Sequence, residues 1–204
     1  MRRPFVLGLT GSMGMGKSTT AAMFRELGVP VWDADRAVRR LYVKRTYAKG
    51  GEAVDLVAQL APGAVINGAV DKERLRQAVA ADPSLLPRLE AVVHPLVAAK
   101  RAAFVASARE DIVLLDVPLL FENGIDAECD AVAVASASAE RQAERLSARG
   151  LSPDEIALLL SRQMPDAEKR ARADWVIPTE TLEGARAAVR HVLDEIRAGR
   201  AGQG

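Results

Sequence analysis

One glycine-rich segment near the N-terminus restricts the fold and chemistry of this 204-residue chain more than any other feature. Residues 11–18 match the pattern G-x-x-x-x-G-K-[ST], between an apolar run at 5–10 and a stretch with helical spacing at 19–27. Backbone N–H groups of such a loop can surround a polyphosphate, and the following helix adds its positive end. The position between a strand and a helix favours a phosphate-binding loop over a glycine turn with a surface lysine.

Side chains at the end of this loop extend the prediction to a nucleotide and its metal ion. Lys17 supplies a positive charge for the β- and γ-phosphates, and Ser18 offers a hydroxyl to Mg²⁺. We therefore predict that the loop and the residue after it hold ATP. The predicted ATP-binding residues of this segment are Gly11, Ser12, Met13, Gly14, Met15, Gly16, Lys17, Ser18 and Thr19.

The alternation of short apolar runs with helical stretches predicts an α/β fold. The apolar runs, rich in Val, Ile and Leu, are residues 5–10, 29–32, 112–117, 131–135 and 175–177. Strands that are apolar at nearly every position suit a parallel sheet covered by helices on both faces, whereas half-exposed antiparallel strands would alternate.

The stretch between the second and third runs is too long for one crossover helix, so we expect an additional helical subdomain there. Asp71 is placed to cap one helix in it. Pro95 is expected to break or kink the next helix at His94. Residues 44–51 indicate a basic loop, and the tail after Arg197 is expected to fray.

Charge and composition exclude several classes of partner. Lys plus Arg total 28 against 27 for Asp plus Glu, so the net charge of +1 provides no field to gather a polyanion such as nucleic acid. No stretch approaches the roughly 18 apolar residues of a membrane span. The single cysteine, Cys129, cannot form an internal disulfide. We expect a cytoplasmic protein with no nucleic acid, no membrane and no obligate protein partner.

Two acids after the second run favour a kinase among phosphate-loop proteins. The guanine-specific N-K-x-D and the switch D-x-x-G of a GTPase are missing. Asp33 and Asp35 instead follow the second strand, and the carboxyl ends of parallel strands line the ligand crevice. One acid can accept a hydroxyl proton while the other helps to hold a metal ion. The alternative is a solvated or helix-capping pair, with Asp35 capping a helix that starts at Arg36.

The third run ends in Asp116, which is the pattern of a strand-end metal ligand, although a loop-capping role is the alternative. Residues 118–122, four apolar residues and a glutamate, follow it and indicate a wall for an organic substrate, in which Leu119 is a predicted contact. Thr10, at the end of the first run, is placed on the same substrate side.

Arg141, Arg145 and Arg149 have the spacing of one basic stripe along a helix. The stripe suggests a mobile lid that closes its guanidinium groups onto the triphosphate, and a solvated helix face is the alternative. His94 has two interpretations, a satisfied histidine at a helix break and a substrate contact in the inserted stretch.

In this order, these elements resemble the dephospho-CoA kinase family over residues 5–177. The resemblance rests on the phosphate loop, Asp33-Ala34-Asp35, His94-Pro95-Leu96, residues 116–122, residues 161–164 and residues 172–174. It implies transfer of the ATP γ-phosphate to the 3′-hydroxyl of the dephospho-CoA ribose, the last step of coenzyme A synthesis. The implied fold is a five-stranded parallel core with a helical CoA-binding domain and a lid.

The resemblance also implies roles for individual residues. By its position in the motif, Asp35 resembles the catalytic base of the family, and Asp33 resembles a residue of the metal or substrate shell. Arg145 resembles the lid arginine that reaches the phosphates. The resemblance places His94 on the acceptor side. The sequence departs from the family at Ser12, where a second glycine is usual, and at residues 43–51, where a shorter Pro-Gly turn is usual. Pro178 and Thr179 replace a common Asp-Asn pair, so no adenine contact is carried over to them.

We predict a P-loop core at 1–35, 110–140 and 173–197, an acceptor domain at 36–109, a lid at 141–172 and a frayed tail at 198–204. Catalysis is assigned to Lys17, Asp35 and Arg145, and Mg²⁺ binding to Ser18, Asp33 and Asp116. The alternatives are a kinase for another small molecule or nucleotide, and an ATP-dependent regulatory module.

Overall fold

The computed structural model describes residues 3–43 and 51–201, and the chain divides into two compact units. The core unit consists of residues 1–32 and 108–204, and the inserted unit consists of residues 33–107. Apart from Gly51, the predicted basic loop at 44–51 lies outside the described residues.

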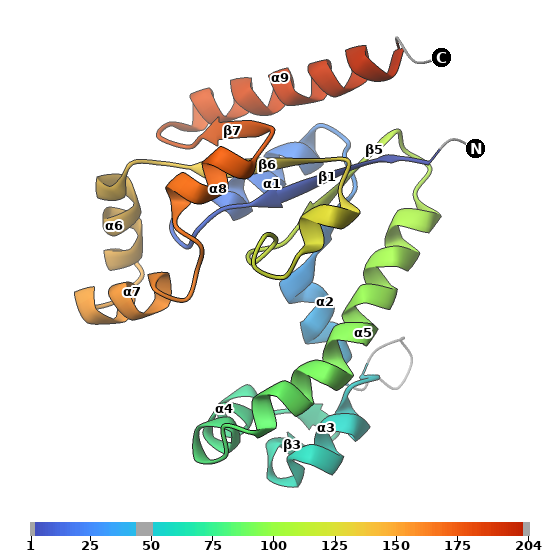
Figure 1. Cartoon of the computed structure of the whole chain (residues 1–204), viewed down its shortest axis with the longest axis vertical. Helices are drawn as coiled ribbons and strands as arrows, with labels where there is room; N and C mark the ends of the chain where they lie inside the picture. The colour runs from blue at the N-terminus through green and yellow to red at the C-terminus, as the bar shows by residue number, and fades with distance from the viewer. Residues whose placement is uncertain (1–2, 44–50, 202–204) are drawn as a thin grey trace. The chain divides into compact units, whose positions relative to one another are not determined.

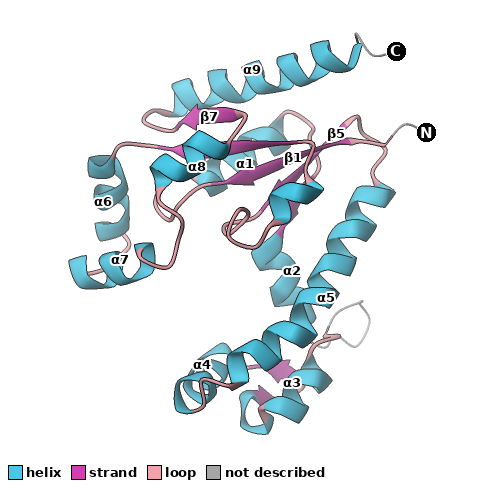
Figure 2. Ribbon diagram, viewed as in Figure 1, coloured by secondary structure: helices cyan, strands magenta, loops and turns pink. Residues whose placement is uncertain are grey.

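A five-stranded parallel sheet forms the centre of the core unit (Figures 1 and 2). In spatial order its strands are β2 (Val31–Asp33), β5 (Ile112–Asp116), β1 (Phe5–Thr10), β6 (Ala131–Ser136) and β7 (Trp175–Pro178). Every residue of β5 and β6 is buried, as expected for strands covered on both faces. The predicted α/β class is confirmed.

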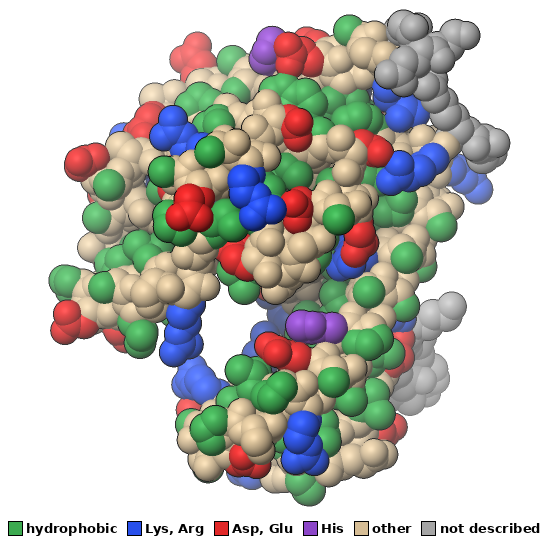
Figure 3. Space-filling model, viewed as in Figure 1, with side chains coloured by type: hydrophobic (Ala, Val, Ile, Leu, Met, Phe, Trp, Pro, Cys, Tyr) green, Lys and Arg blue, Asp and Glu red, His purple; other side chains and the backbone are tan. Residues whose placement is uncertain are grey.

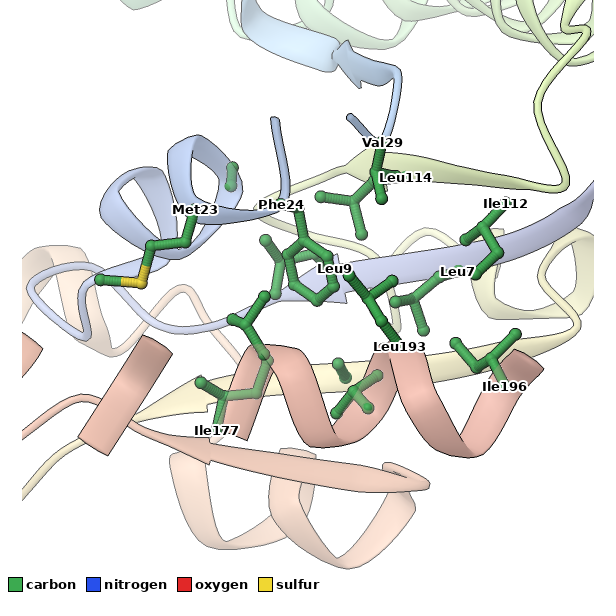
Figure 4. Close-up of a cluster of buried hydrophobic side chains, with 14 of the residues drawn as sticks. Leu7, Leu9, Met23, Phe24, Val29, Ile112, Leu114, Ile177, Leu193 and Ile196 are labelled. Carbon is green, nitrogen blue, oxygen red and sulfur yellow. The ribbon is translucent and has the colours of Figure 1, made fainter. Parts of the chain in front are cut away.

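The described part of the core unit also contains five helices and a short 3₁₀ turn. They are α1 (Lys17–Glu26), the 3₁₀ turn η2 (Ile125–Glu128), α6 (Ala139–Ser147), α7 (Pro153–Leu160), α8 (Asp166–Arg172) and α9 (Leu182–Ala201). Of these, α1, α8 and α9 pack against the sheet. Figure 4 shows Phe24 of α1 and Leu193 of α9 against Leu7 and Leu9 of β1. Alternate residues of β1 thus face α1 and α9, so this layer holds the segment after β1 at a fixed place over the sheet.

The inserted unit has a hydrophobic core of its own. Its elements are α2 (Ala34–Leu41), α3 (Val54–Leu60), a 3₁₀ turn (Pro62–Ala64), β3 (Val65–Ile66), β4 (Ala69–Val70), α4 (Lys72–Ala81) and α5 (Leu85–Ser107). Asp71 accepts a hydrogen bond from the Arg74 N–H at 2.9 Å and caps α4 as predicted. Leu85, Leu89 and Val93 of α5 are buried in this core.

A small hairpin in the inserted unit was not predicted. Strands β3 and β4 pair in an antiparallel manner around Asn67 and Gly68, whose φ angles are 49° and 74°. An Asn-Gly pair with positive φ at both positions is the usual two-residue hairpin turn, so the sequence did carry the signal.

Two predictions need correction, a helix break at Pro95 and a frayed C-terminal tail. Of the predicted break or kink, the break is wrong, because helix α5 runs through Pro95 without interruption, while its ribbon bends along its length in Figure 1. Buried residues on both sides of the proline, Val93 and Arg101, hold the helix together despite the lost backbone donor. Helix α9 extends to Ala201, so residues 198–201 of the predicted frayed tail are helical.

Candidate active site

The phosphate loop leaves a row of backbone N–H groups without partners. It lies between β1 and α1, and Gly14 and Gly16 have φ angles of 84° and 82°, which favour glycine. Within the described residues, the N–H groups of these glycines and of Lys17, Ser18 and Thr19 donate to no other group. Unpaired amides beside the N-terminus of a ten-residue helix form an anion-binding concavity.

A buried ion pair brings the predicted lysine and the predicted strand-end acid together. Lys17 Nζ lies 2.5 Å from Asp116 Oδ1, and the two side chains are 14% and 7% exposed. Lys17 is the first residue of α1, and Asp116 is the last residue of β5, which pairs with β1. The sheet topology therefore places a carboxylate beside the loop, as the strand pattern predicted.

The oxygen donors near the loop fit Mg²⁺. Asp116 supplies a carboxylate, and Ser18 supplies an exposed hydroxyl in the first turn of α1. The described part of the chain contains no cluster of three or more His, Cys, Asp or Glu side chains arranged as a complete metal site. Mg²⁺ keeps several waters and takes substrate phosphate oxygens, so one or two protein donors suffice.

Arg145 reaches from α6 to the loop. Its guanidinium donates to the Gly14 carbonyl at 3.1 Å and to Thr179 Oγ1 and O at 3.2 and 2.5 Å. The predicted single basic stripe is wrong, because α6 ends at Ser147 and Arg149 lies beyond it. Arg141 forms its ion pairs with Glu144 and Glu180.

A cavity of about 320 Å³ lies next to this arginine. Arg149 lines it, together with Gly16 and Thr19 of the phosphate-loop segment and Thr181 and Leu182 after β7. It has the dimensions of a small-ligand pocket and both polar and apolar walls. The sequence did not predict its walls after β7.

Residues expected on the substrate side of the core unit occupy the edge where β1 and β5 end. Thr10 is fully buried, and its hydroxyl donates to the Pro118 carbonyl at 3.0 Å. Leu119 is half-buried, whereas Leu120 and Phe121 after it are buried. Thr10 thus fixes the start of the segment that presents Leu119.

Asp33, Asp35 and His94 belong to the inserted unit. Asp33 caps α2, since its Oδ1 accepts from the Arg36 N–H at 2.8 Å, so the alternative of Asp35 as the cap is wrong. Asp35 is an exposed residue in the first turn of α2. His94 is also exposed, and it lies near the middle of the α5 sequence, away from either end of the helix. Their roles toward the phosphate loop stay predictions.

Sequence reasoning missed a buried ion pair behind the segment 118–122. Lys169 of α8 is fully buried, and its Nζ lies 2.9 Å from Glu122 Oε1. The Met164 N–H also donates to this oxygen, at 2.8 Å. Burial alone raises the pKa of Glu122, but the hydrogen bonds from Lys169 and Met164 outweigh it and hold that pKa below its ordinary value of 4.5.

Glu122→Gln should lower the free energy of unfolding at pH 7 by about 1–3 kcal/mol, because Lys169 stays buried without its counter-charge. Since the pKa of Glu122 is lower in the folded than in the unfolded state, its contribution is present above pH 4.5 and is lost as the pH falls through the folded-state value. Urea denaturation should therefore show the gap between wild type and variant closing below pH 4.5. A gap independent of pH would contradict this assignment.

Comparison with known proteins decides the family. A family model described as dephospho-CoA kinase matches residues 5–183. The chain belongs to the dephospho-CoA kinase family. Dephospho-CoA kinase of Cereibacter sphaeroides is 58% identical over 196 residues, which cover 96% of this chain and 97% of that relative. The predicted resemblance is confirmed, and the protein is a phosphotransferase.

Solved structures share the fold of this chain. A crystal structure from Thermus thermophilus superposes with a TM-score of 0.82 at 34% identity, covering 95% of this chain and 98% of that one. Dephospho-CoA kinase from Campylobacter jejuni gives a TM-score of 0.71 at 23% identity, with 96% and 98% covered, and supports the fold.

Two properties relate to the predicted partners, the distribution of surface charge and the apolar character of the helices. On the face shown in Figure 3, acidic and basic side chains are interspersed, in line with the net charge of +1. Among the described helices, none combines the length and the apolar character needed to cross a membrane.

Proposed function

We propose that this kinase transfers the γ-phosphate of ATP to the 3′-hydroxyl of the dephospho-CoA ribose. The observation that carries the nucleotide half of the proposal is a set of unpartnered N–H groups beside the Lys17 ammonium, those of Gly14, Gly16, Lys17, Ser18 and Thr19. The acceptor half rests on membership in the family.

ATP is proposed to place its phosphates on these N–H groups and its base and ribose in the cavity beside Arg145 and Arg149. When ATP binds, the Lys17 ammonium leaves the Asp116 carboxylate and pairs with the β- and γ-phosphates instead. This exchange frees the Asp116 carboxylate, and Arg145 stabilises charge on the transferred group.

Mg²⁺ is proposed to bind the Ser18 hydroxyl and the Asp116 carboxylate, with Asp33 in the surrounding shell. When bound, the ion neutralises phosphate charge during transfer. Because the Oδ1 atom of Asp33 accepts the Arg36 N–H, its contribution falls to Oδ2.

The inserted unit is proposed to hold the acceptor. Asp35 takes the proton of the 3′-hydroxyl while the ribose oxygen bonds to the γ-phosphorus and the bond to the β-phosphate oxygen breaks, releasing ADP. His94, Thr10 and Leu119 are proposed acceptor contacts, and Thr10 acts through its hold on Pro118.

The lid is proposed within residues 141–172. Its middle helix, α7, contains no buried residue, whereas α6 and α8 contain the buried side chains Leu146 and Lys169. A moving part is therefore proposed at α7, between fixed flanking helices.

The deciding experiment is mass spectrometry of dephospho-CoA incubated with the protein, ATP and Mg²⁺. One added phosphate on the ribose is the expected result. Nucleosides and nucleotides serve as competing acceptors, and preferential labelling of any of them would replace dephospho-CoA. ATP hydrolysis with no labelled acceptor would favour a regulatory module. A cytoplasmic location stays a prediction, for which cell fractionation is the measurement.

A further inference from the structure

From Met13 to Gly16, at its tip, the phosphate loop alternates between N–H groups that bond within the protein and N–H groups that have no partner among the described residues. The Met13 N–H donates to Gln163 Oε1 at 3.1 Å, and the Met15 N–H donates to the Ser12 carbonyl at 3.1 Å. The N–H groups of the intervening Gly14 and Gly16 have no partner among the described residues. Only every second amide at the tip of the loop is therefore available to an anion.

The carbonyl groups of the same peptides show the complementary pattern. Gln142 Nε2 donates to the Met13 carbonyl at 2.7 Å. Thr179 Oγ1, which is buried, donates to the Met15 carbonyl at 2.8 Å. The hydroxyl of Thr179 also lies 3.2 Å from the Ser136 carbonyl, but it has one proton, and the shorter contact goes to the loop.

Each of these carbonyls belongs to the peptide whose N–H is free. The peptide group is planar and no described peptide bond is cis, so its C=O and N–H point in opposite directions. A donor that holds the Met13 carbonyl on the protein side therefore turns the Gly14 N–H away from the protein. Thr179 has the same effect on the Gly16 N–H through the Met15 carbonyl.

Packing independently links the same two side chains to the same two glycines. A Cβ added at Gly14 would lie 3.0 Å from Gln142 Cγ and equally close to Leu146 Cγ, and one added at Gly16 would lie 2.9 Å from Thr179 Oγ1. The contact at Gly16 would force a shift, the contacts at Gly14 are tight, and both glycines have positive φ. The residues that hold the neighbouring carbonyls are thus among those that approach the two glycines closely.

We propose that Gln142 and Thr179 are positioning residues that aim the Gly14 and Gly16 amides at the phosphates of the nucleotide. They act through the Met13 and Met15 carbonyls and do not contact the nucleotide phosphates themselves. The inference rests on the proposed function for the identity of the nucleotide and goes beyond it in assigning these two side chains.

The test removes one hydrogen bond at a time. Gln142→Met and Thr179→Val keep the side-chain size and lose the donor, and Thr179→Ser keeps the hydroxyl. For each variant we would measure KM for ATP, KM for dephospho-CoA, and the inhibition constant of tripolyphosphate, which carries phosphates and no base. Thermal melting reports the fold separately.

Gln142→Met and Thr179→Val should raise KM for ATP and the inhibition constant of tripolyphosphate by the same factor, about 5- to 50-fold, which is the range for a lost buried hydrogen bond. KM for dephospho-CoA should stay within about twofold, because neither carbonyl belongs to the acceptor side. Thr179→Ser should restore both phosphate constants to near wild type.

Wild-type tripolyphosphate inhibition in both Gln142→Met and Thr179→Val would overturn the proposal. So would a parallel rise in all three constants, since a merely structural role does not separate phosphate from acceptor. If wild type fails to phosphorylate dephospho-CoA, the proposed function fails, and direct calorimetry of tripolyphosphate binding still decides the positioning role.

Discussion

Lys17→Met should lower kcat by about 10²- to 10³-fold, with a smaller rise in KM for ATP. Lys17 Nζ, which lies 2.5 Å from Asp116 in this structure, is the cation of the loop. With ATP bound, it would stabilise the negative charge that develops on the β- and γ-phosphates during transfer. Steady-state kinetics with dephospho-CoA as acceptor measure the effect. A kcat within about threefold of wild type would contradict the assignment.

Stability must be separated from catalysis in this variant, because Lys17→Met leaves the 7%-exposed Asp116 side chain without its cation. Adding Asp116→Asn removes the carboxylate charge that Lys17 pairs with in the wild type, so the double variant should melt closer to wild type than Lys17→Met while remaining inactive. Arg186→Met is the matched control, since it breaks an exposed ion pair with Glu26 between α9 and α1 and should leave kcat unchanged.

Asp35→Asn should reduce kcat by about 10²- to 10⁴-fold and leave KM for ATP nearly unchanged. Asparagine has the same size and is accepted in the first turn of α2, but it cannot take the proton of the acceptor hydroxyl. Asp35 is exposed, and Asp33 remains as the helix cap, so the fold should be unaffected.

Glu73→Gln is the matched control for Asp35→Asn, because it also removes an acid from the first turn of a helix in the inserted unit. Single-turnover kinetics with Mg-ATP bound in advance would measure the chemical step alone. A normal single-turnover rate in Asp35→Asn would remove Asp35 from the role of base, whatever its effect on acceptor affinity.

Local patterns were sufficient to predict the main elements of the fold. The apolar runs that became β1, β5 and β6 are buried at nearly every position, which only a sheet covered on both faces provides. The phosphate loop was predictable because its glycines and lysine are adjacent in sequence. Asp116 was predictable because parallel strands bring their carboxyl ends to one edge.

Contacts between distant segments could not be read from spacing. Nothing near Glu122 in the sequence indicates its pairing with Lys169, and nothing near Met13 indicates Gln142 or Gln163. Thr179 replaces an expected asparagine, yet it holds the loop by its hydroxyl. The break predicted at Pro95 is wrong for a related reason. The prediction used only the backbone donor that proline lacks, whereas packing of α5 in the core of the inserted unit keeps the helix continuous.

The placement of the inserted unit has a consequence for the order in which the chain can fold as it is synthesised. Strand β1 leaves the ribosome early, but Phe5 pairs with Ile112 and Leu7 with Ala131. The whole of residues 33–107, with a separate hydrophobic core, is translated before either partner exists. The nascent protein must therefore keep the apolar strand β1 unpaired while the inserted unit is synthesised, which makes this interval a period of exposure to aggregation or chaperone capture.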